Sequence, residues 1–142
     1  YLHKKVDTLF EACTHISIHC NLTDETHHLV NEKRMNLMPG KSGTILCGNH
    51  IVNCARGGIV DENALLVALE NGTITSAALD VFEIEPLPDN YALTQHPNFH
   101  GTPHIGAATM EAQRRVGLDI ADAIITGLSG KSPKTVVNSK FL

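Results

Sequence analysis

One cation, several carboxylates and one histidine each come shortly after an apolar run that is typical of a buried strand. These side chains are Arg56, Asp80, Glu83, Glu85 and His104. In parallel α/β sheets, ligands bind beyond the carboxyl ends of the strands, where groups that follow neighbouring strands converge. We therefore predict that these side chains meet at one edge of a sheet.

The three residue types have complementary chemistry. Arginine presents a planar fork that holds a carboxylate through two parallel hydrogen bonds, which lysine cannot reproduce. Histidine gives or takes a proton near neutral pH, and a carboxylate beside it favours the imidazolium, which can donate to a developing alkoxide. Gly57 and Gly58, directly after Arg56, would let the backbone approach a ligand closely. The set predicts proton transfer on a substrate that carries a carboxylate.

Each of these residues also has an ordinary structural explanation when it is taken singly. An arginine at a strand end commonly forms a salt bridge, an acid before a proline commonly lies in a solvated turn, and a loop histidine can simply be hydrogen-bonded. Arg56, Glu85 and His104 fit these descriptions. Only their joint position after neighbouring strands favours a functional interpretation.

The elements that must position these residues alternate along the chain. Apolar runs predict strands over His15–Cys20, Ile51–Cys54, Thr75–Phe82 and Phe99–Thr102. Helical spacing predicts helices over Asp7–Cys13, over Asn31–Met38, from an N-cap at Asp61 to Asn71-Gly72, and from Thr109 to Gly127. Strands that alternate with helices indicate βαβ units and a parallel sheet, so the predicted fold class is α/β.

The segment Gly40–His50 does not fit this alternation. It holds a second strand-like run, Thr44–Cys47, directly before the strand that leads to Arg56. Its Gly-Lys-Ser is not a phosphate-binding loop, because the glycine required five positions earlier is Met35. We predict a surface loop or a hairpin insertion.

Composition narrows the function classes. The chain has 142 residues, 42% of them hydrophobic, and a formal net charge of -4, so no basic stripe for nucleic acid or a membrane surface is expected. No apolar run approaches the roughly 20 residues that span a bilayer, and YLHKKVDTLF lacks the apolar core of a signal peptide. These features predict a cytoplasmic protein. The absence of an initiator Met suggests a piece of a longer chain.

The cysteines and histidines do not form a recognisable metal pattern. Four cysteines show no CxxC spacing, and we expect reduced, buried thiols. None of the nine histidines lies in an HExxH or a zinc-finger spacing, so no metal site is predicted.

Three motifs, in order and at the right spacing, resemble signatures of one enzyme family. They are NCARGGIVDENALLVALENG, AALDVFEIEP and TPHIGAAT. They resemble the D-isomer-specific 2-hydroxyacid dehydrogenases, a family that includes phosphoglycerate, glycerate and D-lactate dehydrogenases. The resemblance implies an NAD-dependent interconversion of a 2-hydroxy acid and a 2-oxo acid. It also implies the second half of a Rossmann-like doubly wound sheet over residues 1–108, and a C-terminal helix and tail over 109–142 that belong to a substrate domain.

The resemblance assigns roles residue by residue. Arg56 would hold the substrate carboxylate and carbonyl, His104 would move the proton, and Glu85 would pair with His104. The cofactor would be lined by Cys20, Cys54, Ala55, Arg56, Asp80, His104, Gly106 and Ala107. The family is commonly dimeric, so a homodimer is expected of the full-length parent.

Three departures from the family pattern accompany the resemblance. No GxGxxG occurs anywhere in the chain, Gly40–His50 is longer than usual, and Cys20–Thr23 lacks the customary proline before its leucine. We therefore expect the isolated chain to bind NADH negligibly and to be inactive. Another alternative is an NAD-sensing binding module, since the C-terminal-binding corepressors resemble the same family.

Overall fold

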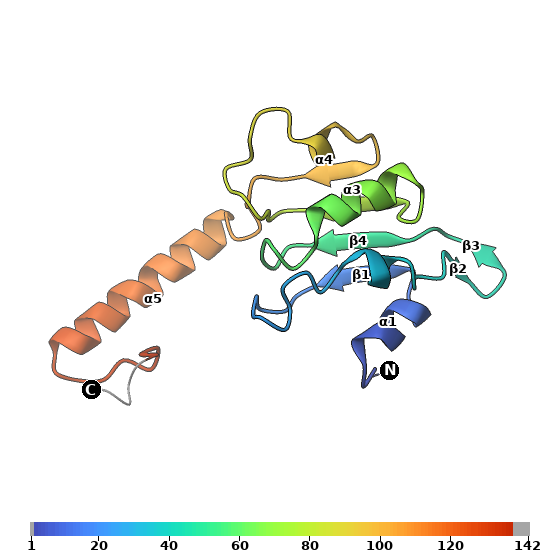
Figure 1. Ribbon diagram of the computed structural model, residues 1–142. Helices are drawn as coiled ribbons and strands as arrows, with labels where there is room; N and C mark the ends of the chain where they lie inside the picture. The colour runs from blue at the N-terminus through green and yellow to red at the C-terminus, as the bar shows by residue number, and fades with distance from the viewer. Residues whose placement is uncertain (1, 138–142) are drawn as a thin grey trace. The chain divides into compact units, whose positions relative to one another are not determined.

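The computed structural model describes residues 2–137 and contains five helices and six strands in that range (Figure 1). The helices are α1 (Val6–Ala12), α2 (Glu32–Met35), α3 (Glu62–Glu70), α4 (Ala92–Gln95) and α5 (Met110–Leu128). The strands are β1 (His15–Ile18), β2 (Lys41–Ser42), β3 (Ile45–Leu46), β4 (His50–Asn53), β5 (Ser76–Leu79) and β6 (Phe99–Gly101). One compact unit ends at His104 and a second begins at Ile105.

The first unit is built on a parallel sheet of four strands in the order β1-β4-β5-β6. In its centre Ile51 is level with Ile16 on one side and Ala77 on the other. At the far edge Leu79 pairs with Gly101. Because all four strands run the same way, their carboxyl ends lie along one edge. The predicted α/β class and the parallel sheet are confirmed.

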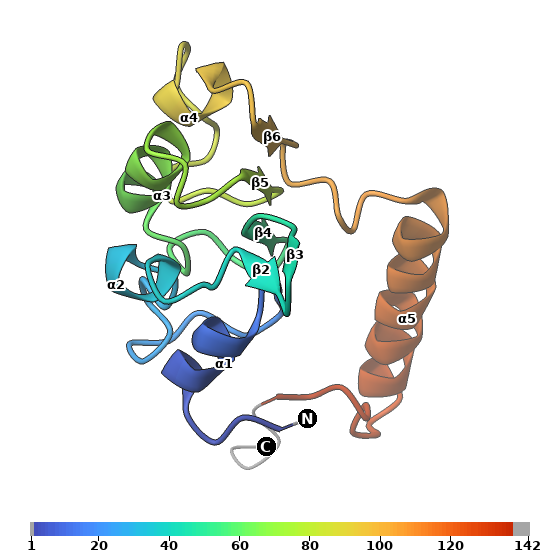
Figure 2. The same cartoon turned by 90° about the vertical axis from the view of Figure 1, so that its right-hand side faces the viewer.

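One face of this sheet forms the core. Burial alternates along β4, where Ile51 and Asn53 are buried while Val52 between them is 38% exposed. Such a period of two places alternate side chains on opposite faces. The helices α1 to α4 lie on the buried side (Figure 2), and Phe10 of α1 and Leu65 of α3 belong to the same hydrophobic cluster. Burial of a side chain such as Leu65 contributes about 1.5–3 kcal/mol.

Local signals account for the start and the end of α3. The Oδ1 atom of Asp61 accepts a hydrogen bond from the backbone N–H of Ala64 at 3.0 Å, which caps the first turn. Asn71 follows the last residue, and Gly72 adopts a positive φ of 79°. The predicted N-cap and C-terminal residues of this helix are confirmed.

Two helices differ from the prediction. Asn31 caps α2 by accepting from the N–H of Arg34 at 3.1 Å, but the helix ends at Met35, three residues before its predicted end at Met38. The four-residue helix α4 was not predicted, because its N-cap Tyr91 makes no side-chain capping bond and so leaves no capping signal.

The segment after α2 is a hairpin, which was one of the two predicted alternatives. Strands β2 and β3 pair antiparallel, and the N–H groups of Cys47 and Gly48 both donate to the carbonyl of Gly40. The buried side chain of Asn49 fixes the base of the hairpin, since it accepts from the N–H of Gly40 at 2.7 Å and donates to the carbonyls of Met38 and Thr73. The hairpin therefore enters β4 at the amino end of that strand.

The prediction of buried thiols is wrong. All four cysteines are free, but Cys13, Cys20 and Cys47 are only partly buried and Cys54 is exposed. None of them lies inside a helix or strand, and Cys20 and Cys54 follow the carboxyl ends of their strands. The core positions within the strands are filled by aliphatic residues instead, which leaves the thiols at the margins.

The second unit consists of α5 and the residues around it. Thr109 caps the helix by accepting from the N–H of Ala112 at 3.1 Å, as predicted, and the helix runs to Leu128, one residue past the predicted end. None of its residues is buried. Its assignment to a substrate domain stays a prediction. Within residues 2–137 no helix combines the length and the apolar character required to cross a membrane.

Candidate active site

The loop after β4 carries Arg56 and is organised by Asn53. This asparagine is buried, its Nδ2 donates to the carbonyl of Arg56 at 2.9 Å, and its Oδ1 accepts from the N–H of Ala55 at 3.0 Å. A buried amide with both ends hydrogen-bonded holds the loop in one conformation. The side chain of Arg56 is exposed, and its Nη1 donates to the carbonyl of Ala55 at 2.7 Å. The loop thus presents a guanidinium to solvent on a fixed backbone.

The two glycines after Arg56 have structural roles. A Cβ on Gly57 would lie 1.8 Å from the carbonyl oxygen of Phe82 and 2.9 Å from the nitrogen of Glu83. Gly58 adopts a positive φ of 79°, a conformation that favours glycine. The missing side chain of Gly57 thus lets the arginine loop touch the loop after β5, and close approach of the two glycines to a ligand stays a prediction.

The loop after β5 carries a carboxylate that pairs with a histidine after β6. Glu85 accepts from His104 Nδ1 through Oε2 at 2.8 Å, and from the N–H of Phe82 through Oε1 at 2.8 Å. The bond from His104, and then that from Phe82, hold the pKa of Glu85 below its usual range. Since an ionised carboxylate only accepts, Nδ1 must carry the proton, which leaves Nε2 as the nitrogen for exchange with a substrate.

The pairing of Glu85 and His104 makes a pH-dependent contribution to stability. A carboxyl whose pKa is lowered by folding stabilises the fold above its unfolded pKa, and this contribution is lost as the pH falls through the folded value. We expect the difference in unfolding free energy between the wild type and Glu85→Gln to be fully present above the usual glutamate range of about 4.3. Below that pH it should shrink.

Chemical denaturation of both proteins between pH 7 and 3 measures this difference. Taking the difference cancels the titration of other acids, such as Asp7, whose pKa is also lowered, by hydrogen bonds from Arg34 and Lys33. A difference that stays constant or grows as the pH falls from about 4.3 to 3 would contradict the assignment.

Asp80 ties three strand ends together. It is buried, its N–H donates to the carbonyl of Asn53 at 2.9 Å, and its Oδ1 accepts from the hydroxyl of Thr102 at 2.6 Å. The ends of β4, β5 and β6 are therefore held in register beneath the loops that carry Arg56, Glu85 and His104. This geometry fixes the edge of the sheet at which the functional groups lie.

A pocket of about 370 Å³ adjoins the pair of Glu85 and His104. It is lined by Phe82, Glu85, Pro86, Leu87, Pro103 and His104. An apolar pocket with a few polar groups is the usual character of a small-molecule site. The pocket is formed wholly by residues of the first unit.

The other predicted cofactor residues occupy different environments. Cys54 and Ala55 follow β4 at the same edge of the sheet, and Cys20, which follows β1, packs against the hydrophobic core. Gly106 and Ala107 follow His104 closely in sequence and belong to the second unit, and their contact with the cofactor stays a prediction.

Sequence reasoning missed Asn53, Glu62, Tyr91 and Thr102, whose side chains support the site. The role of Asn53 could have been predicted. A buried asparagine at the end of an apolar run must be hydrogen-bonded, and the adjacent loop offers the nearest backbone partners. The partners of Glu62 lie 21 and 29 residues away, so no local pattern could have indicated them.

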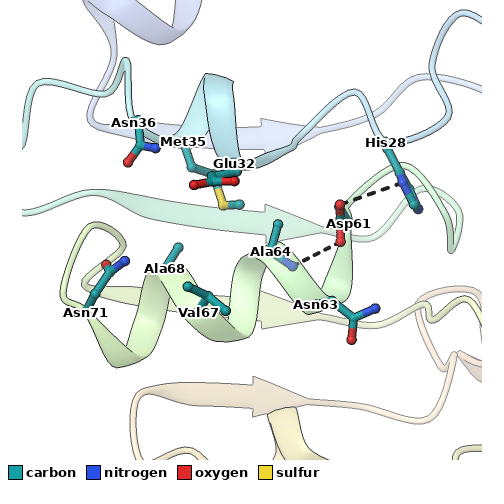
Figure 3. A pocket seen from close by; sticks show the side chains of 10 residues that line it. All are labelled: His28, Glu32, Met35, Asn36, Asp61, Asn63, Ala64, Val67, Ala68 and Asn71. Carbon is teal, nitrogen blue, oxygen red and sulfur yellow. Dashed lines mark hydrogen bonds and ion pairs between the residues drawn. The ribbon is translucent and has the colours of Figure 1, made fainter.

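A second hollow, of about 420 Å³, lies between α2 and α3 (Figure 3). Asp61 caps α3 there, and its second oxygen lies 3.8 Å from Nδ1 of His28. The carboxylate of Asp61 is engaged in capping, and His28 is bonded through Nε2 to Glu83 at 2.9 Å. Both ring nitrogens of His28 therefore face carboxylates, and neither is left for a substrate, so we do not place the chemistry there. Within residues 2–137 no group of three or more His, Cys, Asp or Glu is arranged to hold a metal ion.

The parallel sheet and the groups at its carboxyl edge define a Rossmann-like nucleotide-binding domain. The family model described as "D-isomer specific 2-hydroxyacid dehydrogenase, NAD binding domain" matches residues 1–106 of this chain. The chain therefore belongs to the D-isomer specific 2-hydroxyacid dehydrogenase family, and the resemblance found in its motifs is confirmed.

Individual relatives agree with this assignment. A glyoxylate reductase of Thermofilum pendens is 44% identical over 137 residues, which are 96% of this chain and 38% of the relative. A D-3-phosphoglycerate dehydrogenase of Methanocaldococcus jannaschii is 46% identical over 136 residues, which are 94% of this chain and 24% of the relative. The chain thus spans well under half the length of these relatives.

A solved structure shows the same fold. The D-isomer specific 2-hydroxyacid dehydrogenase of Xanthobacter autotrophicus Py2, in complex with NADPH and MES, superimposes with a TM-score of 0.72 at 32% identity. The match covers 91% of this chain and 50% of that one. The similar protein thus holds a nicotinamide dinucleotide.

Proposed function

We propose that the protein to which this chain belongs transfers a hydride between NAD(H) and a D-2-hydroxy acid/2-oxo acid pair. The observation that carries the proposal is the pair of Glu85 and His104, joined at 2.8 Å at the carboxyl edge of a parallel sheet. Proton transfer must accompany hydride transfer whenever a hydroxyl becomes a carbonyl. A histidine that is oriented by a carboxylate supplies that proton path.

His104, Glu85 and Arg56 have different roles in the proposed reaction. His104 accepts the hydroxyl proton of the hydroxy acid on Nε2 and returns it to the carbonyl oxygen in the reverse direction, while Glu85 holds the ring by Nδ1. Arg56, on a loop fixed by Asn53, binds the substrate carboxylate with its guanidinium fork. Bound NAD would supply the hydride acceptor for C2 of the hydroxy acid.

The donor set fits the nicotinamide end of the cofactor. Cys54 and Ala55 are small and follow β4 at the edge where ligands of such sheets bind, and Asp80 lies beneath the same edge. The 142 residues contain no GxGxxG, the motif whose helix N-terminus binds the pyrophosphate. We therefore assign to this chain only the nicotinamide end, with Cys20, Gly106 and Ala107 as further proposed lining residues.

This division predicts the behaviour of the chain in isolation. Without a glycine-rich loop, the 142-residue chain should give no detectable heat of binding with NADH at concentrations up to about 1 mM, where the binding energy would be only about 4 kcal/mol. Isothermal calorimetry measures this directly. Micromolar affinity would show that the residues present suffice to hold the dinucleotide.

The proposed activity is tested with the complete protein, in which the preceding sequence is restored. NADH oxidation is followed with hydroxypyruvate, glyoxylate, pyruvate and phosphohydroxypyruvate, and at least one should be turned over. A binding module like the C-terminal-binding corepressors would behave differently: titration with NADH would cause oligomer formation, and no 2-oxo acid would be turned over. That result would replace the enzymatic proposal with an NAD-sensing binding function.

Two further properties are proposed for the complete protein. Four free cysteines fit a reducing compartment such as the cytoplasm, where thiols persist. A homodimer is proposed from the family resemblance, and light scattering of the complete protein tests it.

A further inference from the structure

Glu62 is a buried carboxylate that the proposed reaction does not use. It lies in the first turn of α3 and is 4% exposed. Its Oε1 accepts from the backbone N–H of Glu83 at 2.7 Å, and its Oε2 accepts a short hydrogen bond from the hydroxyl of Tyr91. Burial raises the pKa of Glu62, and burial together with the bond to Glu62 raises the pKa of Tyr91. Burying a carboxylate costs free energy unless it is hydrogen-bonded, so the position of Glu62 and its two bonds call for a functional explanation.

Glu62 is not needed to cap its own helix. Asp61 already satisfies that function by accepting from the N–H of Ala64. Both oxygens of Glu62 are instead directed at the segment between β5 and α4. The favourable effect of an acid near a helix N-terminus would be available to any exposed carboxylate in this turn, without the cost of burial.

The bond from Glu83 fixes one peptide group of the active-site loop. The N–H of the Phe82–Glu83 peptide donates to Glu62, and its carbonyl lies directly over Gly57, where no Cβ would fit. The preceding N–H, that of Phe82, donates to Oε1 of Glu85. The other oxygen of Glu85 accepts from His104. A continuous path therefore leads from Glu62 through two adjacent peptide groups, on either side of Phe82, to the pair of Glu85 and His104.

We propose that Glu62 is a positioning residue, which orients the Phe82–Glu83 peptide and thereby aims Glu85 at His104. The proposal rests on the proposed function for its catalytic meaning, but its structural content concerns this chain alone. No contact of Glu62 with substrate or cofactor is proposed. Its effect is transmitted through the backbone to a pair whose geometry must be held closely for proton transfer.

The test is the pKa of the Glu85 carboxyl, measured from its ¹³C chemical shift against pH in the 142-residue chain. A positioning role and a purely electrostatic role of Glu62 predict changes of opposite sign in the pKa of Glu85. If Glu62 acts only as a nearby negative charge, its removal in Glu62→Ala lowers the pKa of Glu85 further, because a like charge has been taken away. If Glu62 positions the loop, the same change weakens the bonds from His104 and Phe82, and the pKa of Glu85 rises towards its ordinary value.

Two further variants separate geometry from charge. Glu62→Gln removes the charge but keeps an oxygen for the N–H of Glu83 and an NH₂ for the Tyr91 hydroxyl, so it should leave the pKa of Glu85 near or below the wild-type value. Glu62→Asp keeps the charge but shortens the side chain by one methylene, so it should raise the pKa of Glu85. The aspartate variant also serves if Glu62→Ala does not fold.

Leu69→Val is the matched control for loss of stability. Leu69 is buried in the same helix and forms no part of the path to Glu85. This variant should lower Tm and leave the pKa of Glu85 unchanged. A rise in the pKa of Glu85 that occurs in Glu62→Asp and Glu62→Ala, but not in Leu69→Val, supports the positioning role. A fall in Glu62→Ala, no change in either of these variants, or an equal rise in Leu69→Val overturns it. The measurement needs no turnover, so failure of the proposed activity would be seen separately.

Discussion

Replacing Gly57 with alanine is expected to lower the free energy of unfolding by about 3 kcal/mol or more, in the range of severe overpacking. The new Cβ would lie 1.8 Å from the oxygen and 2.2 Å from the carbon of the Phe82 carbonyl. These are backbone atoms, so no change of rotamer relieves the overlap. The same peptide is held on its other side by Glu62, which limits how far the loop can retreat.

Chemical denaturation of Gly57→Ala beside Gly72→Ala measures this effect. Gly72 has a positive φ of 79° and open space around its Cα, so alanine there causes backbone strain without a clash. Strain of that kind costs about 1–2 kcal/mol. If Gly57→Ala proved no more costly than Gly72→Ala, the two loops would not be in the tight contact described.

Replacing Arg56 with lysine in the complete protein is expected to lower kcat/KM by about 100-fold, which corresponds to about 2.7 kcal/mol of lost transition-state stabilisation. The reason is geometric, because an ammonium is a point charge and cannot form the two parallel bonds of a guanidinium. Arg56 is exposed, and its carbonyl rather than its side chain is bonded to Asn53. The substitution should therefore leave Tm unchanged within about 2 °C, as is usual for exposed positions.

Steady-state kinetics with the best 2-oxo acid tests this prediction, and Arg34→Lys provides the control. Arg34 binds Asp7 of α1 through Nε at 2.8 Å, on the helix-covered side of the sheet. Its variant should keep kcat/KM within about twofold of the wild type, as expected of a residue with no contact to the reacting groups. Activity of Arg56→Lys that matches this control would remove Arg56 from its proposed role.

The parts of the fold that could be predicted depend on local patterns. The apolar run that begins at Ile51 marks a strand, and Asp61 marks the start of α3, because each signal lies within a few residues of the feature that it specifies. The hairpin was foreseen for the same reason. The tertiary partners of a residue carry no such signal, which explains why the contact of Gly57 with Phe82 was not predicted.

The candidate site shows the same division. That Arg56, Glu85 and His104 follow neighbouring strands was visible in the order of the segments, and the parallel sheet confirms this arrangement. The supporting residues could not be predicted from the sequence. Glu62, for example, bonds to Glu83 and Tyr91, which lie 21 and 29 residues further along the chain. The burial of the cysteines was also misjudged, since hydrophobicity alone does not distinguish the interior of a strand from its end.

The hairpin of β2 and β3 has a practical consequence. Residues 41–46 are exposed throughout, and the chain enters and leaves this segment at the bonded pair of Gly40 and Gly48. It precedes β4, so it lies at the end of the strands opposite to the arginine loop. A fluorophore or an affinity tag grafted at Gly43, a glycine with open space around it, would report on the protein while leaving the proton-transfer pair untouched.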